Sequence, residues 1–105
     1  MTALEHIRAT PQRFNPDDKP EAETCFHFSI SGEGGGELTV TVKDGKCNVQ
    51  DGLQGSSKCV VQATDDTYMD IINGKQNPQM AVFTGKLKIS NLAEMMKFHK
   101  LFGFV

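Results

Sequence analysis

The chain lacks the features of a membrane-spanning, secreted or zinc-binding protein. Its 105 residues include no tryptophan, one tyrosine and three cysteines. No apolar run reaches the roughly 18 residues that a transmembrane helix needs, and the first residues lack the basic and apolar regions of a signal peptide. The odd number of cysteines without Cys-x-x-Cys spacing predicts free thiols in strands. We therefore expect a cytoplasmic protein, in a reducing compartment.

Positive charge is also too sparse to predict nucleic-acid binding. Eleven lysines and arginines stand against thirteen acidic residues, which gives a net charge of −2. The basic residues are scattered along the chain, whereas a nucleic-acid surface needs a basic stripe or patch. We expect no nucleic-acid partner.

Catalytic and metal-binding patterns are missing as well. The three histidines are far apart and lack the spacing of zinc ligands. Neither Gly74-Lys75 nor Gly85-Lys86 is followed by the serine or threonine of a phosphate-binding loop. His27 alternates with Phe26 and Phe28, so we expect it to face solvent on the opposite side of a strand. The sequence therefore predicts no enzyme activity, no metal site and no cofactor.

What the chain does contain is a change from strand to helix patterning near residue 64. Apolar residues alternate with polar ones over 24–30, 38–43, 47–49 and 59–63, which predicts four strands. Asp44-Gly45 between two of them is a strong hairpin signal. A short helix over Ala3–Arg8 and a proline-rich arm, which we expect to be irregular, precede the strands, and this leading segment covers 1–23.

Helical patterns dominate after residue 64. Thr64 or Asp65 can cap a first helix, Asn77-Pro78 opens a second, and a helix from Asn91 follows a strand over 87–89. We expect a single domain over 1–105 of the α+β class. Its predicted core is a mostly antiparallel, twisted five-stranded sheet with helices on one face.

Residues 72–89 combine these signals most densely, in the order Ile-Asn-Gly-Lys-Gln-Asn-Pro-Gln-Met-Ala-Val-Phe-Thr-Gly-Lys-Leu-Lys-Ile. Glycine ends one helix and proline starts the next. This stretch resembles the sterol carrier protein type two, or non-specific lipid-transfer, family, and the resemblance extends over roughly residues 24–100. It implies that the sheet and helices enclose a hydrophobic tunnel.

The resemblance also implies which side chains line that tunnel. Residues of the sheet would form its floor, the two middle helices its walls, and the C-terminal segment a movable cover. The candidate lipid-binding residues are Phe28, Ile30, Val40, Met69, Ile72, Met80, Phe83, Leu87, Ile89, Met95, Met96, Phe98, Leu101, Phe102 and Phe104.

Two functions stay open at this point. One is non-catalytic intracellular binding and transfer of lipids, whether fatty acids, fatty acyl-CoA, sterols or phospholipids. The other is an accessory interaction domain with a closed cavity, which dimerises or docks on a lipid- or quinone-modifying enzyme. The expected partner is a lipid or fatty acyl ligand. Transient membrane contact and a homodimer through the apolar C-terminus are left open.

Overall fold

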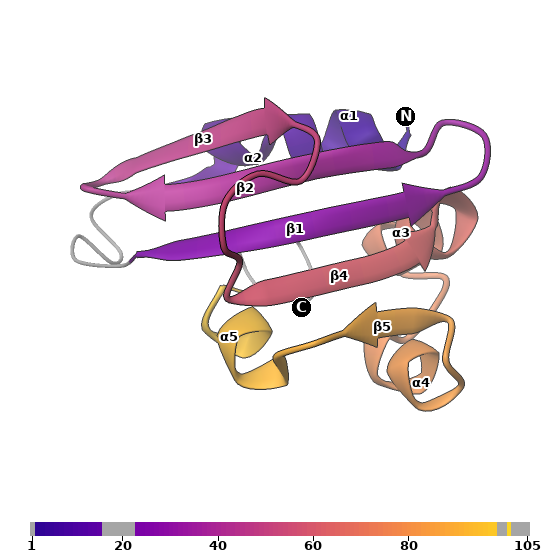
Figure 1. Cartoon of the computed structure of the whole chain (residues 1–105). Helices are drawn as coiled ribbons and strands as arrows, with labels where there is room; N and C mark the ends of the chain where they lie inside the picture. Colours follow the sequence, from indigo (N-terminus) through magenta and orange to yellow (C-terminus); the bar gives the residue numbers. More distant parts are fainter. Residues whose placement is uncertain (1, 16–22, 99–100, 102–105) are drawn as a thin grey trace.

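Five strands form one sheet whose helices all lie on the same face (Figure 1). The computed structural model describes residues 2–15, 23–98 and 101. The strand order is β3-β2-β1-β4-β5. The strands are β1 (Thr24–Ser31), β2 (Gly36–Lys43), β3 (Lys46–Asp51), β4 (Cys59–Thr64) and β5 (Leu87–Ile89). All neighbours pair antiparallel except β1 and β4, which are parallel. The predicted α+β fold with a mostly antiparallel sheet is confirmed.

All the described helices except α2 begin at a capping side chain. They are α1 (Ala3–Arg8), α2 (Thr10–Arg13), α3 (Asp65–Ile72), α4 (Pro78–Phe83) and α5 (Leu92–Lys97). Thr64 caps α3 by accepting a hydrogen bond from the Thr67 N–H. The Asn77 side chain accepts from two backbone N–H groups at the start of α4, and Asn91 caps α5. Each cap satisfies backbone donors that the first helical turn leaves without partners.

The N-terminal segment is more helical than its prolines predict. Pro11 lies in the first turn of α2, where a missing N–H costs no intrahelical hydrogen bond. The expectation of an irregular arm is therefore wrong for Thr10–Arg13. The rest of the predicted arm, over 16–22, lies outside the described residues.

The hairpin between β2 and β3 turns at Asp44-Gly45, as predicted. Both residues have positive φ, 54° and 72°. A two-residue hairpin of this kind needs two left-handed residues, and Asp-Gly supplies them with little strain.

The connection between β3 and β4 crosses in front of β2 and β1 and covers part of the opposite face of the sheet (Figure 1). Thr39 Oγ1 donates to Gly52 O at 2.7 Å and accepts from Gln54 N at 2.9 Å. His27 Nε2 lies 2.9 Å from Gln54 O, and His27 is only 9% exposed. The expectation that His27 faces solvent is wrong, because this connection buries it.

Candidate functional site: an apolar interior

The interior between the sheet and the helices is floored by rows of apolar side chains. Strand pairing places Phe28 beside Leu38 on one side and beside Val61 on the other. Phe26 occupies the same position between Val40 and Cys59. Since alternate residues of a strand share a face, these rows meet the helices as one continuous apolar surface. Every one of these six side chains is fully buried.

Short helices cover this floor. Tyr68 and Ile71 come from α3, Ile7 from α1, and Met95 from α5, and all are buried. The Tyr68 ring meets Phe28 edge-on with centroids 6.4 Å apart. Phe98, just after α5, meets Phe26 edge-on at 5.9 Å. The cover is thus built from separate elements of four to eight residues rather than from one long helix.

A hydrogen-bonded pair of polar side chains lies inside this cover. His6 Nδ1 is 2.9 Å from Tyr68 Oη, and His6 is 8% exposed. Burial, with Arg13 as the second cause, lowers the pKa of His6 to about 4. Burial also raises the pKa of Tyr68 well above its usual value. Both side chains are therefore neutral near pH 7, which reduces the cost of placing them beside an apolar interior.

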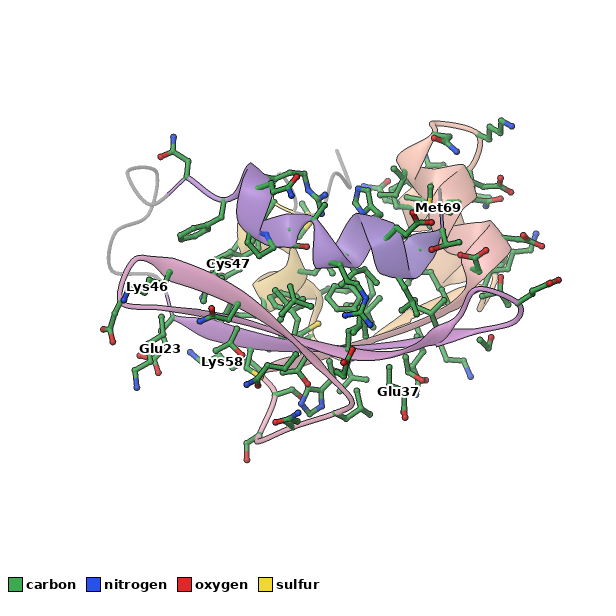
Figure 2. All side chains as sticks on the ribbon, turned by 90° about the horizontal axis from the view of Figure 1, so that it is seen from above. Glu23, Glu37, Lys46, Cys47, Lys58 and Met69 are labelled. Atoms are coloured by element: carbon green, nitrogen blue, oxygen red, sulfur yellow. The ribbon has the colours of Figure 1, made fainter. Side chains whose placement is uncertain are left out.

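Arg13 lies at the margin of the same region. Its Nε donates to Leu101 O at 2.9 Å and its Nη2 donates to Thr10 Oγ1 at 3.1 Å. Burial lowers the pKa of Arg13 and raises that of Cys47 to about 11. Cys47 points from β3 to the helical side of the sheet (Figure 2). Its thiol thus stays protonated and serves as a small apolar group.

Glu94 is the buried acid of the interior, at 6% exposure. Thr24 Oγ1 donates to Glu94 Oε2 at 2.5 Å, and Lys97 Nζ lies 3.6 Å from Glu94 Oε1. This arrangement attaches α5 to the beginning of β1. The α5 cover is therefore fixed by a polar contact as well as by apolar packing.

The structure separates the predicted lipid-binding residues into three groups. Buried in the interior are Phe28, Ile30, Val40, Leu87, Met95 and Phe98. Partly buried and packed against this core are Met69, Ile72, Ile89 and Leu101. Exposed are Met80, Phe83 and Met96. Phe102 and Phe104 lie outside the described residues. Contact of any of these side chains with a lipid stays a prediction.

Several interior residues were missed by the sequence reading. Ile7, Phe26, Leu38, Val61 and Tyr68 are fully buried in the same cluster. The strand residues among them share the alternation of Phe28 and Val40, so the period-two pattern contained the signal. Ile7 could not be assigned from its six-residue helix alone, because its position depends on how α1 docks on the sheet.

The site is built mainly from buried apolar side chains. The described residues contain no group of three or more histidine, cysteine or acidic side chains arranged to hold a metal ion. Over the same part of the chain, no helix has both the length and the apolar character needed to cross a bilayer. The fold and the interior define a small α+β domain whose helices enclose an apolar layer above a five-stranded sheet.

The comparisons with known proteins identify the family. Residues 6–103 match the model of the SCP-2 sterol transfer family, and the chain belongs to that family. Sterol carrier protein 2 from Homo sapiens is 39% identical over 80 residues, which are 72% of this chain. The chain spans only 15% of the length of that relative.

Solved structures show the same fold. A double mutant of the sec-alkyl sulfatase PisA1 superposes with a TM-score of 0.84 at 16% identity, over 96% of this chain and 16% of that one. Palmitated SCP2L2 from Aedes aegypti superposes with a TM-score of 0.68 at 19% identity, over 95% of this chain and 92% of that one. Because the sequence identities are only 16% and 19%, these superpositions show similarity of the fold alone.

Proposed function

We propose that this domain binds a lipid with its acyl chain or ring system in the apolar interior and transfers it without catalysis. The observation that carries the proposal is the apolar layer between sheet and helices, in a chain that belongs to a sterol transfer family. Interior side chains without a reactive group can exclude water and pack against hydrocarbon, but they offer little for bond making.

The energetics favour a long acyl chain as cargo. Burying one methylene group contributes about 0.8 kcal/mol. A sixteen-carbon chain therefore has roughly 12 kcal/mol of gross driving force, which ordering costs reduce to an affinity of about micromolar or better. The palmitated relative is consistent with such a ligand. Because hydrophobic burial, unlike hydrogen bonding, does not depend on the orientation of the groups, we expect the domain to accept fatty acids, acyl-CoA, sterols and phospholipids alike.

Entry of the ligand requires the cover to separate from the floor. The cover consists of several short helices joined by turns, and the partly buried Met69, Ile72 and Leu101 lie around the buried cluster. Unbranched Met adapts to irregular or changing neighbours. These residues are the ones that we expect to shift first when a lipid enters.

The test is extraction and mass spectrometry of lipid bound to the purified protein, followed by titration with a fluorescent fatty acid. We expect co-purified lipid, or saturable probe binding that palmitate reverses. Protein that carries no lipid and leaves the probe unbound would refute the proposal.

A second candidate is an accessory domain with a filled interior that acts beside an enzyme. Two observations favour it. The chain spans a small part of a much longer relative and of a sulfatase of similar fold. In addition, the stacked pair Phe26 and Phe28, with ring centroids 6.2 Å apart, fills the middle of the floor.

Ala63→Leu separates the two candidates. Ala63 lies on the floor between Ile30 and Leu87 and is 8% exposed. In an interior that opens for a ligand, the larger side chain occupies ligand space and weakens probe binding with little loss of stability. In a filled interior, overpacking costs about 1–3 kcal/mol of unfolding free energy. Gln62→Leu, one residue earlier on the exposed face, is the matched control for added apolar volume.

A further inference from the structure

β3 is an edge strand of the sheet, and among the described residues no strand pairs with its outer side (Figure 1). Its six residues pair one-to-one with β2, without a bulge. It contains no proline, and its middle, Cys-Asn-Val-Gln over residues 47–50, carries no charge. Natural proteins protect edge strands with charges, prolines, bulges or a very short length, because an open edge can pair with another strand. The middle of β3 has none of these protections.

The other edge strand of the sheet is protected. β5 has only three residues, and its middle residue is the exposed Lys88. A short strand with a central lysine offers few backbone groups and a charge to any approaching strand. Pairing with a further strand is therefore expected at β3 rather than at β5.

The pairing with β2 determines which backbone groups of β3 reach the free edge. In an antiparallel pair, residues that exchange hydrogen bonds with the neighbouring strand alternate with residues that do not. The two-residue turn at Asp44-Gly45 makes Lys43 and Lys46 a hydrogen-bonded pair. Farther along, Gly52 N donates to Glu37 O at 2.9 Å, which fits the same alternation. The even-numbered residues of β3 therefore hydrogen-bond to β2.

The odd-numbered residues of β3 direct their N–H and C=O groups outward. These residues are Cys47, Val49 and Asp51. The Asp51 carbonyl already accepts from Gln54 Nε2 at 2.7 Å, and its second lone pair leaves room for another donor. The free edge thus presents three regularly spaced residues to an antiparallel strand.

We propose that two copies of this chain pair antiparallel through β3, about a two-fold axis that passes through Val49. In this register Val49 lies opposite Val49 of the second copy, and Cys47 lies opposite Asp51. All three outward residues then form hydrogen-bonded pairs. A shift by two residues in either direction places one of them opposite a residue outside β3.

The same register keeps both copies in compatible orientations. Alternate residues of a strand share a face, and Cys47 points to the helical side of the sheet (Figure 2). Since odd-numbered residues lie opposite odd-numbered residues, the helices of both copies lie on one face of the joined sheet. On the other face the exposed Asn48 lies opposite Gln50 of the second copy. Their amides can both donate and accept hydrogen bonds.

Charge favours an antiparallel second copy as the occupant. One end of the edge has two basic residues and one acid, a net charge of +1, and the other has one basic residue and two acids, a net charge of −1. These residues are Lys43, Asp44 and Lys46 at the hairpin, and Glu37, Asp51 and Arg8, which bonds to Asp51 at 2.6 Å, at the far end. Antiparallel pairing brings the basic end of each copy beside the acidic end of the other. Parallel pairing would place like ends together.

The experiment is analytical ultracentrifugation of the full chain, from about 10 μM to about 1 mM, the range of weak complexes. We expect a reversible dimer whose fraction rises with protein concentration. Asn48→Lys combined with Gln50→Lys places like charges opposite each other across the axis, and should raise the dissociation constant by roughly 2- to 30-fold. The matched control is Gln62→Lys with Gln79→Lys, which adds the same charge at exposed positions of β4 and α4 and should leave the dissociation constant unchanged.

A second variant tests the register. Asn48→Lys combined with Gln50→Glu adds no net charge and places each new lysine opposite a new glutamate of the second copy. The dimer should persist or become tighter in this variant. In a parallel pair, or in a register that places Asn48 opposite itself, the same variant would bring like charges together and weaken the dimer.

Three results would overturn the proposal. They are a monomer at every concentration, equal weakening by the two double-lysine variants, and weakening by Asn48→Lys with Gln50→Glu. Probe binding on the same proteins separates this inference from the proposed function, because the β3 edge lies outside the apolar interior. A chain that dimerises through β3 but binds no fluorescent fatty acid overturns the proposed function alone.

Discussion

The stability of this domain should fall in mild acid because of His6. The folded-state pKa of about 4 is below the ordinary value of 6.5. Between these pH values the unfolded chain binds a proton that the folded chain excludes. Above about pH 6.5, His6 therefore does not lower the free energy of unfolding. As the pH falls from 6.5 toward 4, His6 lowers it progressively.

The two pKa values set the size of the effect. Each pH unit within the window costs up to about 1.4 kcal/mol. The linkage relation gives a loss of about 2 kcal/mol between pH 7 and pH 5, and about 3 kcal/mol once the pH is below 4. Such a loss is a large fraction of the total free energy of unfolding of a domain of this size.

Urea unfolding at pH 7, 6 and 5, at constant ionic strength, measures this loss. Carboxyl groups also titrate at low pH, so the informative quantity is the difference between the wild type and His6→Asn. The asparagine amide can replace Nδ1 in the contact with Tyr68 Oη but does not titrate. We expect the difference to change by about 2 kcal/mol in favour of the variant between pH 7 and pH 5.

A pH-independent difference would refute this reasoning.

Three further substitutions test the contacts that fix the cover. Thr24→Val leaves buried Glu94 without its 2.5 Å donor, and should lower the unfolding free energy by about 1–3 kcal/mol in urea titrations. Asp65→Ala removes the acceptor of the Ala3 N–H, at 2.7 Å, and should speed hydrogen exchange in α1 at a cost of about 1 kcal/mol. Asn77→Ala removes the α4 cap and should lower the melting temperature through a loss of about 1 kcal/mol.

Each of these variants has a control at an exposed or partly exposed site. Thr41→Val, Asp66→Ala and Asn48→Ala should each change the stability by less than about 0.5 kcal/mol. If a control variant loses as much unfolding free energy as the variant it is paired with, the loss cannot be assigned to the contact that the test variant removes.

The strands and helix starts could be predicted because their signals are local. Alternation marked each strand, Asp44-Gly45 marked the hairpin, and Asn77 and Asn91 marked two helix starts. The parallel pairing of β1 with β4 has no comparable local signal. Burial of His27 depends on the connection that this pairing requires, so alternation alone gave the wrong environment.

The candidate site was predicted less completely than the fold. Composition marks Met80 and Phe83 as apolar, but it does not tell which side of a six-residue helix faces the core. In the structure Ala81 takes that side, and the larger residues remain outside. Their role in lipid contact, and the extent of the domain over 1–105, stay predictions.

The parallel pairing also has a consequence for the order of assembly. β1, β2 and β3 form a meander of neighbouring segments, whereas β4 must reach β1 across two intervening strands. Closing a longer loop costs more chain entropy, and non-local pairing slows folding. We therefore expect the meander to form early in folding and β4 to join it later. The helices α3, α4 and α5 follow β4 in the chain, so we expect the apolar interior to be completed in the last stage of folding.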